Sequence, residues 1–385
     1  MRKTVIVVGG GPAGLSFARA MAGSPHKVVV IERQSLESLG APAPDGREIA
    51  LTLRSETILK ELGAWPHLPQ DEIYPLREAR VRNGSSPFAM AIDPEDGAAL
   101  GNLVSNHHIR EALFDAIDSQ SNVELICGRT VSSAQTGANG VKVTLDDGRE
   151  LIGDVLIAAD SRFSEMRQQL GVDASITRFG HTMLVCRIAH SLPHRGISTE
   201  WFDHGRTVAL LPLSEGMSGL VVTVGADEAT RICALPDREI EDLFATFLGG
   251  QWGEIELVSR PQAYPLVMTY AESFAGQRWA LIGDTAVGMH PVTAHGFNFG
   301  LLGAWRLAKL LARADDPGAT RLLKRYGLQH RLATMPLYEG TRQLVKLYTD
   351  DRPHARPLRA GILRLGALRP VSKLMGRLLS EARPA

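Results

Sequence analysis

Short runs of apolar, β-branched residues alternate with helical stretches at the start of the chain. Residues 4–8 and 27–31 are such runs, and residues 13–21 between them have the apolar spacing of a helix. Strands that are apolar at every position are typical of a parallel sheet covered on both faces. The pattern therefore predicts a βαβ unit with a right-handed crossover.

Further elements follow the same two periods. Residues 155–159 and 279–283 are again fully apolar and predict buried strands, and residues 142–151 alternate around an Asp-Gly pair, which predicts a β-hairpin. Helices are expected at 55–63, 108–119 and 297–312.

A different pattern occupies the middle of the chain. Residues 181–226 contain several short runs in which apolar and polar positions alternate, and residues 73–98 resemble a strand pair. Such alternation is typical of an antiparallel sheet with two unlike faces. We expect a mostly antiparallel unit inserted into the α/β unit.

Composition excludes several classes of protein. The 385 residues suit two units, and 42 Lys and Arg balance 42 Asp and Glu, so no overall charge attracts nucleic acid. The three cysteines, Cys127, Cys186 and Cys233, are scattered, which indicates a reducing, cytoplasmic setting. No metal site is expected, because no His, Cys or carboxylate cluster has a ligand spacing.

The first chemical signal lies directly after the first strand. Gly9, Gly11 and Gly14 form a Gly-x-Gly-x-x-Gly that opens a helix, with Pro12 and Ala13 between them. The glycines allow a tight turn and close approach to a pyrophosphate, and the helix N-terminus supplies amide donors. Glu32, about 20 residues on, ends the second strand, where a carboxylate accepts hydrogen bonds from an adenosine ribose. A dinucleotide site is predicted, with FAD and NAD both open.

A second signal near the other end of the chain selects FAD. A strand ends in Gly283-Asp284, a loop passes through Pro291, and Gly296-Phe297-Asn298 opens a helix. This arrangement resembles the flavin-side motif of the group A flavoprotein monooxygenases, which are built like p-hydroxybenzoate hydroxylase. The resemblance implies that Asp284 bonds the ribityl chain and that the amides around Gly296, Phe297 and Asn298 face the isoalloxazine. A helix N-terminus there stabilises the negative charge of reduced flavin.

A third segment, Asp160 to Arg167, resembles the Asp-Gly motif of the same family, which is implied to serve both FAD and a reduced nicotinamide. Ser161 replaces the glycine and would be strained if that position needs a positive φ. The resemblance also gives four further cofactor positions, of which the arginines have an alternative reading as surface residues: Arg33, Arg47, Arg110 and Val131.

Within that family the chain looks closest to the ubiquinone-biosynthesis hydroxylases of the UbiH, UbiF and UbiM types, above all to the UbiM branch. The string from Gly283 to Asn298 carries this likeness, and it departs from the commoner Ala-Gly-Gln-Gly at Thr293-Ala294-His295-Gly296. The implied fold is α/β, a Rossmann-like FAD-binding domain of the glutathione-reductase type with an inserted, mostly antiparallel substrate domain and a helical tail. The expected ranges are 1–72, 99–178 and 266–345 for FAD, 73–98 and 179–265 for substrate, and 346–385 for the tail.

The resemblance implies an FAD-dependent monooxygenase. By this resemblance we expect NAD(P)H or another donor to reduce FAD and oxygen to add as a flavin hydroperoxide, which would hydroxylate a prenylated phenol or quinol of ubiquinone biosynthesis. His290 and His295 are expected near the flavin, where they either assist phenol deprotonation or bond the backbone of their loop. Two alternatives stay open: a flavin oxidoreductase that inserts no oxygen, and a non-catalytic flavin-bearing scaffold of a biosynthetic complex.

The C-terminal tail has a composition of its own. Residues 352–379 contain seven Arg or Lys and no acidic residue, with apolar side chains at spacings of three and four. A basic amphipathic helix of this kind docks on a membrane surface or a partner protein. The alternative is a helix packed on the FAD-binding domain.

Overall fold

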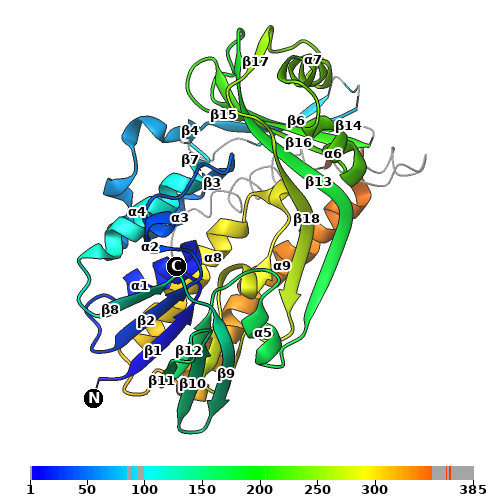
Figure 1. The fold of residues 1–385 in the computed structure, drawn as a ribbon. Helices are drawn as coiled ribbons and strands as arrows, with labels where there is room; N and C mark the ends of the chain where they lie inside the picture. The colour runs from blue at the N-terminus through cyan, green and yellow to red at the C-terminus, as the bar shows by residue number, and fades with distance from the viewer. Residues whose placement is uncertain are drawn as a thin grey trace.

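The computed structural model describes residues 2–84, 86, 88–92, 99–203, 205–348, 361, 364 and 365. Figure 1 shows a helix-covered parallel sheet at one end and a larger sheet at the other, joined by two long strands. The cavity that concerns function lies between these two sheets.

The first sheet has six strands in the order β19-β20-β12-β1-β2-β8. Its strands are β1 (Thr4–Val8), β2 (Lys27–Glu32), β8 (Val123–Cys127), β12 (Val155–Ala158), β19 (Ala275–Gly276) and β20 (Trp279–Leu281). All neighbours pair in parallel except β19 and β20. Because β1 and β12 are buried on both faces, almost every position is apolar, as the sequence pattern predicts.

Helices cover this sheet and share its core. The larger ones are α1 (Pro12–Ala20), α3 (Leu53–Glu61), α4 (Asn106–Asp118), α8 (Gly296–Leu311) and α9 (Thr320–Tyr348). One hydrophobic cluster joins the strands to Phe17 of α1, Leu307 of α8 and Tyr326 of α9. The short helices are α2 (Leu36–Gly40), α5 (Glu165–Gln169), η1 (Trp65–His67), η2 (Gln70–Glu72), η3 (Gly283–Thr285) and η4 (Pro291–Thr293).

The larger sheet has nine strands, in the order β21-β18-β13-β16-β15-β14-β5-β6, with β17 beside β13. These are β5 (Glu78–Asn83), β6 (Ala89–Ile92), β13 (Ala174–His190), β14 (Ile197–Asp203), β15 (Arg206–Pro212), β16 (Met217–Gly225), β17 (Ile255–Leu257), β18 (Gln262–Ala271) and β21 (Val287–Gly288). Among the strand pairs that the structure describes in this sheet, only β14 and β5 are parallel, so the predicted antiparallel character is confirmed. Helices α6 (Ala226–Cys233) and α7 (Asp237–Phe247) pack on its outer face.

The expected domain limits fall inside two continuous strands. Strand β13 passes through the limit at 178/179, and β18 passes through the limit at 265/266. Figure 1 shows both strands running from beside α5 up into the larger sheet. The two units therefore share their connecting strands, and the division of the chain into domains stays a prediction.

Two small sheets complete the fold. The predicted hairpin is present as β10 (Gly140–Leu145) and β11 (Glu150–Gly153), with β9 (Val131–Gly137) beside it. The segment expected as one strand pair is divided: β4 (Tyr74–Leu76) joins β7 (Gly101–Ser105) and β3 (Glu48–Leu51), whereas β5 and β6 join the larger sheet.

Candidate functional site

One cavity of about 1180 Å³ collects most of the predicted cofactor residues. It lies between the helix-covered parallel sheet and the inner face of the nine-stranded sheet. The predicted residues that line it are Gly11, Pro12, Ala13, Glu32, Arg33, Arg47, Arg110, Asp160, Gly283, Asp284, His290, Pro291, His295, Gly296, Phe297 and Asn298. Gly9, Gly14 and Val131 are not among the lining residues, and Val131 is buried in the core.

The glycine loop shows why each glycine is needed. Gly9 has a φ of +109°, and a Cβ there would lie 2.4 Å from the Ala159 carbonyl oxygen. A Cβ on Gly14 would lie 1.9 Å from the Gly9 carbonyl oxygen, so these two glycines serve the turn and the helix packing. No atom lies within 4 Å of a Cβ on Gly11, which faces the cavity directly before α1. This open backbone at a helix N-terminus fits a diphosphate.

Glu32 fixes the loop and faces the same cavity. Its carboxylate accepts the Gly10 N–H at 2.6 Å and the Gln34 N–H at 2.9 Å, and the side chain is buried. Each carboxylate oxygen has further acceptor capacity, so bonds to a ribose hydroxyl remain available. The placement suits the role expected for Glu32.

The Asp160 segment is tied to the loop after β20. Asp160 accepts hydrogen bonds from the hydroxyls of Ser164 at 2.6 Å and Thr285 at 3.1 Å. The Ser161 N–H donates to the Thr285 hydroxyl oxygen at 3.2 Å. Among the described non-glycine residues a positive φ occurs only at Arg195, Arg278 and Ala294. Ser161 is therefore not strained, and the serine fits this turn.

Asp284 has a partner that sequence reasoning missed. Arg162 donates to its carboxylate from Nη2 at 2.8 Å and from Nε at 3.1 Å, and from Nη1 to the Val267 carbonyl oxygen. The arginine stands two residues after Asp160, but its pairing depends on two distant loops meeting. A carboxylate held in this way at the cavity wall can still accept a hydroxyl donor, as the ribityl role of Asp284 requires.

The Asn298 side chain links the two halves of the flavin-side wall. Its Oδ1 accepts the Thr52 N–H at 3.1 Å, and its Nδ2 donates to the carbonyl oxygens of Ala50 at 2.9 Å and Ala294 at 2.8 Å. Ala294 has a left-handed backbone with φ of +53°. The Asn298 side chain thus fixes the loop before α8. The helix begins at Gly296, and its first residues line the cavity.

The two histidines of this loop bond its backbone. His290 Nδ1 accepts the Val292 N–H at 3.2 Å, and burial lowers the pKa of His290 to about 4. His295 is buried and its Nδ1 contacts the Thr293 carbonyl oxygen. These contacts match the backbone-bonding alternative, and a catalytic role for either ring stays a prediction.

The arginines expected at the cofactor are held in different ways. Arg47 Nε donates to Asp45 at 3.0 Å; burial opposes ionisation of Asp45, but the bond to Arg47 outweighs it and the pKa of Asp45 is lowered. Arg110 Nη2 donates to the Gln34 side chain at 3.0 Å, and Arg33 is exposed at the rim. All three arginines line the cavity, where a guanidinium group can bind an anionic group such as a phosphate.

The opposite wall is the inner face of the nine-stranded sheet. It is mainly apolar, lined by Met183, Val185, Phe202, Ala209, Leu211, Val221 and Leu266. Glu200 of β14 is the carboxylic acid that the described part of this sheet brings to the cavity, and sequence reasoning missed it. Residues 197–203 do not alternate between apolar and polar side chains, so no sequence pattern marked the inner face of β14.

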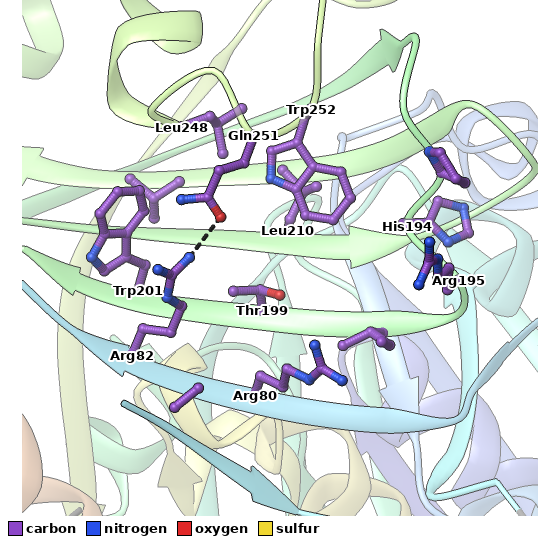
Figure 2. A pocket seen from close by; sticks show the side chains of 14 residues that line it. Arg80, Arg82, His194, Arg195, Thr199, Trp201, Leu210, Leu248, Gln251 and Trp252 are labelled. Atoms are coloured by element: carbon purple, nitrogen blue, oxygen red, sulfur yellow. Dashed lines mark hydrogen bonds between the residues drawn. The ribbon is translucent and has the colours of Figure 1, made fainter. Parts of the chain in front are cut away.

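The outer face of the same strands carries a separate, smaller pocket of about 440 Å³. Figure 2 shows Thr199 and Trp201 of β14 on this side, with Arg82 donating to the Gln251 side chain at 2.6 Å. The two faces of the sheet therefore differ in kind: one is an apolar wall and the other is rich in arginine and tryptophan.

The remaining predictions concern membranes and the tail. Within the described ranges, no helix combines the length and the apolar character that crossing a bilayer requires. The predicted basic helix at 352–379 lies outside the described residues, apart from 361, 364 and 365.

Comparisons with known proteins agree with this geometry. The FAD binding domain family matches residues 2–339. Ubiquinone hydroxylase UbiM of Neisseria meningitidis is 43% identical, covering 99% of this chain and 85% of that protein. Ubiquinone hydroxylase UbiL of Rhodospirillum rubrum is 31% identical, covering 97% and 88%. The crystal structure of p-nitrophenol 4-monooxygenase PnpA from Pseudomonas putida has the same fold, with a TM-score of 0.78 at 18% identity over 99% of this chain and 100% of that one. The chain thus belongs to the FAD binding domain family and, within it, to the FAD-dependent hydroxylases of the UbiM type, which confirms the family predicted from its two glycine-rich motifs.

Proposed function

We propose that the protein hydroxylates the aromatic ring of a prenylated phenol or quinol intermediate of ubiquinone biosynthesis, with NAD(P)H or another reductant as the electron donor. The names of the relatives support the pathway, since UbiM and UbiL are both ubiquinone hydroxylases. The observation that carries the proposal is the continuity of a single cavity from Gly11 to the apolar sheet wall.

The residues divide the work along that cavity. The loop at Gly11 would hold the diphosphate of FAD, Glu32 the ribose, Asp284 the ribityl chain, and the N-terminus of α8 the isoalloxazine. When bound, FAD would supply the chemistry that reacts with molecular oxygen. The protein contributes orientation of the ring and exclusion of water, for which the apolar sheet wall is suited.

A lipid-tailed substrate fits the far end of the cavity. Leu344 and Val345 of α9 and the exposed Leu365 line it, so apolar surface continues toward the C-terminal tail. We propose that the prenyl chain lies along this surface. We also propose that the protein is cytoplasmic and that its basic tail contacts the inner face of the membrane. A chain ending at Arg352 is then expected to lose binding to vesicles of anionic phospholipid, and equal binding by both chains contradicts the membrane contact.

The test of the function is the mass of the product. The purified protein with FAD, NAD(P)H and a short-chain prenylated phenol should yield a product with one added oxygen atom, and a reaction without reductant is the control. A product that differs by two hydrogens instead indicates a flavin oxidoreductase. No substrate-stimulated oxygen uptake with any donor indicates a scaffold, and either outcome overturns the proposal.

A further inference from the structure

Strand β14 presents a carboxylic acid to the large cavity. Ser198, Glu200 and Phe202 line that cavity, because alternate side chains of a strand point to the same face. Thr199 and Trp201 point the other way, into the small outer pocket in Figure 2. The acid therefore belongs to the substrate wall and not to the arginine-rich outer face.

Glu200 has apolar neighbours in its own row of the sheet. Across the sheet it stands opposite Ala209 of β15 and Val81 of β5. Among the residues that the structure describes, no hydrogen bond or ion pair holds its carboxylate. The nearby Arg80 is bonded to Glu78. Burial raises the pKa of Glu200 to about 8. A lone carboxyl in an apolar wall is costly, and perturbed groups of this kind concentrate at functional sites.

The position of Glu200 along β14 places it near the flavin-side loop. Phe202, two residues further on, packs in the same hydrophobic cluster as Val292 of η4. Glu200 and the residues from Met289 to Gly296, which lead into the N-terminus of α8, line the same cavity.

We propose that Glu200 binds the ring hydroxyl group of the substrate and accepts its proton as the new carbon–oxygen bond forms. This inference rests on the proposed hydroxylation and assigns recognition of the free ring hydroxyl to Glu200. A ring whose hydroxyl is methylated has no proton to give and leaves the carboxyl without its partner.

The step balances in atoms and electrons. The hydroxyl O–H bond breaks, its proton passes to a Glu200 oxygen, and its electron pair raises the electron density of the ring. A ring carbon takes one atom of O₂, and the other leaves as water, with two electrons from the reductant passed through the cofactor. Loss of the C–H proton and return of the Glu200 proton to the ring oxygen restore the aromatic phenol and the ionised carboxylate. A base with a pKa near 8 is better matched to a phenol, near 10, than an ordinary glutamate is.

Other ionisable groups line the same cavity. The strands beside β14 bring Thr207, Ala209 and Leu211 from β15 and Ala79, Arg80 and Val81 from β5 to the cavity. The other ionisable groups on its walls are His181, Tyr264, His290, His295, Glu32, Arg33, Arg47, Glu48, Arg110, Asp160, Arg162 and Asp284. Burial takes His290 down to a pKa of about 4 and raises the pKa of Tyr264 above 10, so neither titrates near pH 8.

The experiment compares Glu200→Gln and Glu200→Leu with a matched control, Glu78→Gln, on the neighbouring strand. We expect both Glu200 variants to lower kcat/KM for a prenylated phenol at least about 100-fold, with FAD content unchanged. The wild-type rate should rise through pH 8, the Glu200→Gln rate should not, and the control should follow the wild type. A Glu200→Leu protein that keeps the wild-type kcat/KM and pH profile overturns the inference.

A second readout needs no turnover. The folded-state pKa of about 8 lies above the ordinary 4.5, so Glu200 costs increasing stability as the pH rises between these values. Glu200→Gln should therefore raise the melting temperature at pH 9 by about 6 °C and leave it unchanged at pH 4. An equal effect at both pH values contradicts a Glu200 whose ionisation is suppressed in the folded protein.

The outcomes separate the two proposals. If the wild type adds no oxygen to any phenol, the proposed function fails. Equilibrium binding of the phenol and of its methyl ether then decides the role of Glu200. Tighter binding of the phenol by the wild type, lost in Glu200→Leu, supports recognition of the hydroxyl, and equal binding of both ligands overturns it.

Discussion

Single side chains in this fold connect segments that the sequence keeps far apart. Asn298 satisfies Thr52, Ala50 and Ala294 at once, and Arg162 bonds Asp284 across the cavity wall. Asn298 and Asp284 were recognisable as site residues from the sequence, because few residue types occur at the N-terminus of a helix or at the end of a buried strand. Their partners depend on how loops meet in space. That information is absent from any single stretch of sequence, and for this reason Arg162 was missed.

Replacing Asn298 tests this connection. Asn298→Ala leaves one N–H and two carbonyl groups without their partner in a buried position, at about 1 kcal/mol each. We expect the free energy of unfolding to fall by about 3 kcal/mol and FAD to bind more weakly, as measured by urea unfolding and by flavin titration. Asn139→Ala, in an exposed hairpin turn, is the control and should change neither. Full stability of the Asn298 variant contradicts this account.

The elements were predictable to the extent that their pattern is local. Strand β12 is buried throughout and the 142–151 hairpin has its Asp-Gly turn, so period and turn chemistry were sufficient. The division of 73–98 between two sheets was not predictable, because the pairing partners lie elsewhere in the chain. The inner face of β14 was not predicted for the same reason: residues 197–203 do not alternate between apolar and polar side chains, and only the neighbouring strands decide which face meets the cavity.

Close packing of α8 on α9 gives a prediction at this scale. A Cβ on Gly303 of α8 would lie 2.7 Å from the buried His330 ring, whereas a Cβ on Gly340 of α9 meets no atom within 4 Å. Gly303→Ala should therefore destabilise the protein by about 1–3 kcal/mol. Gly340→Ala should stabilise it by up to about 1 kcal/mol, because alanine favours the helix. Urea unfolding measures the change in unfolding free energy for both variants. Changes of the same sign would contradict the close packing of Gly303 on His330.

At the scale of the whole molecule, buried titratable groups limit stability at both ends of the pH range. Burial lowers the pKa of His330 to about 3 and that of His290 to about 4, from an ordinary 6.5. It raises that of Glu200 to about 8. The histidines are neutral in the folded protein and gain protons more readily when unfolded, whereas Glu200 loses its proton more readily when unfolded. Stability should therefore be lost toward acid through the histidines and toward alkali through Glu200.

The acid limb can be assigned to one ring. Since the unfolded chain binds the proton of His330 below pH 6.5 and the folded chain does not until about pH 3, the contribution is full above 6.5 and falls by about 1.4 kcal/mol per pH unit below it. His330→Leu should flatten the decline of the unfolding free energy between pH 6.5 and pH 4, whatever it does to stability at pH 7. His67→Leu, at an exposed position, should leave the slope as it is in the wild type. Chemical unfolding at half-unit pH steps measures both slopes. An unchanged slope in His330→Leu would show that this ring binds its proton equally in the folded and unfolded states, which contradicts the prediction.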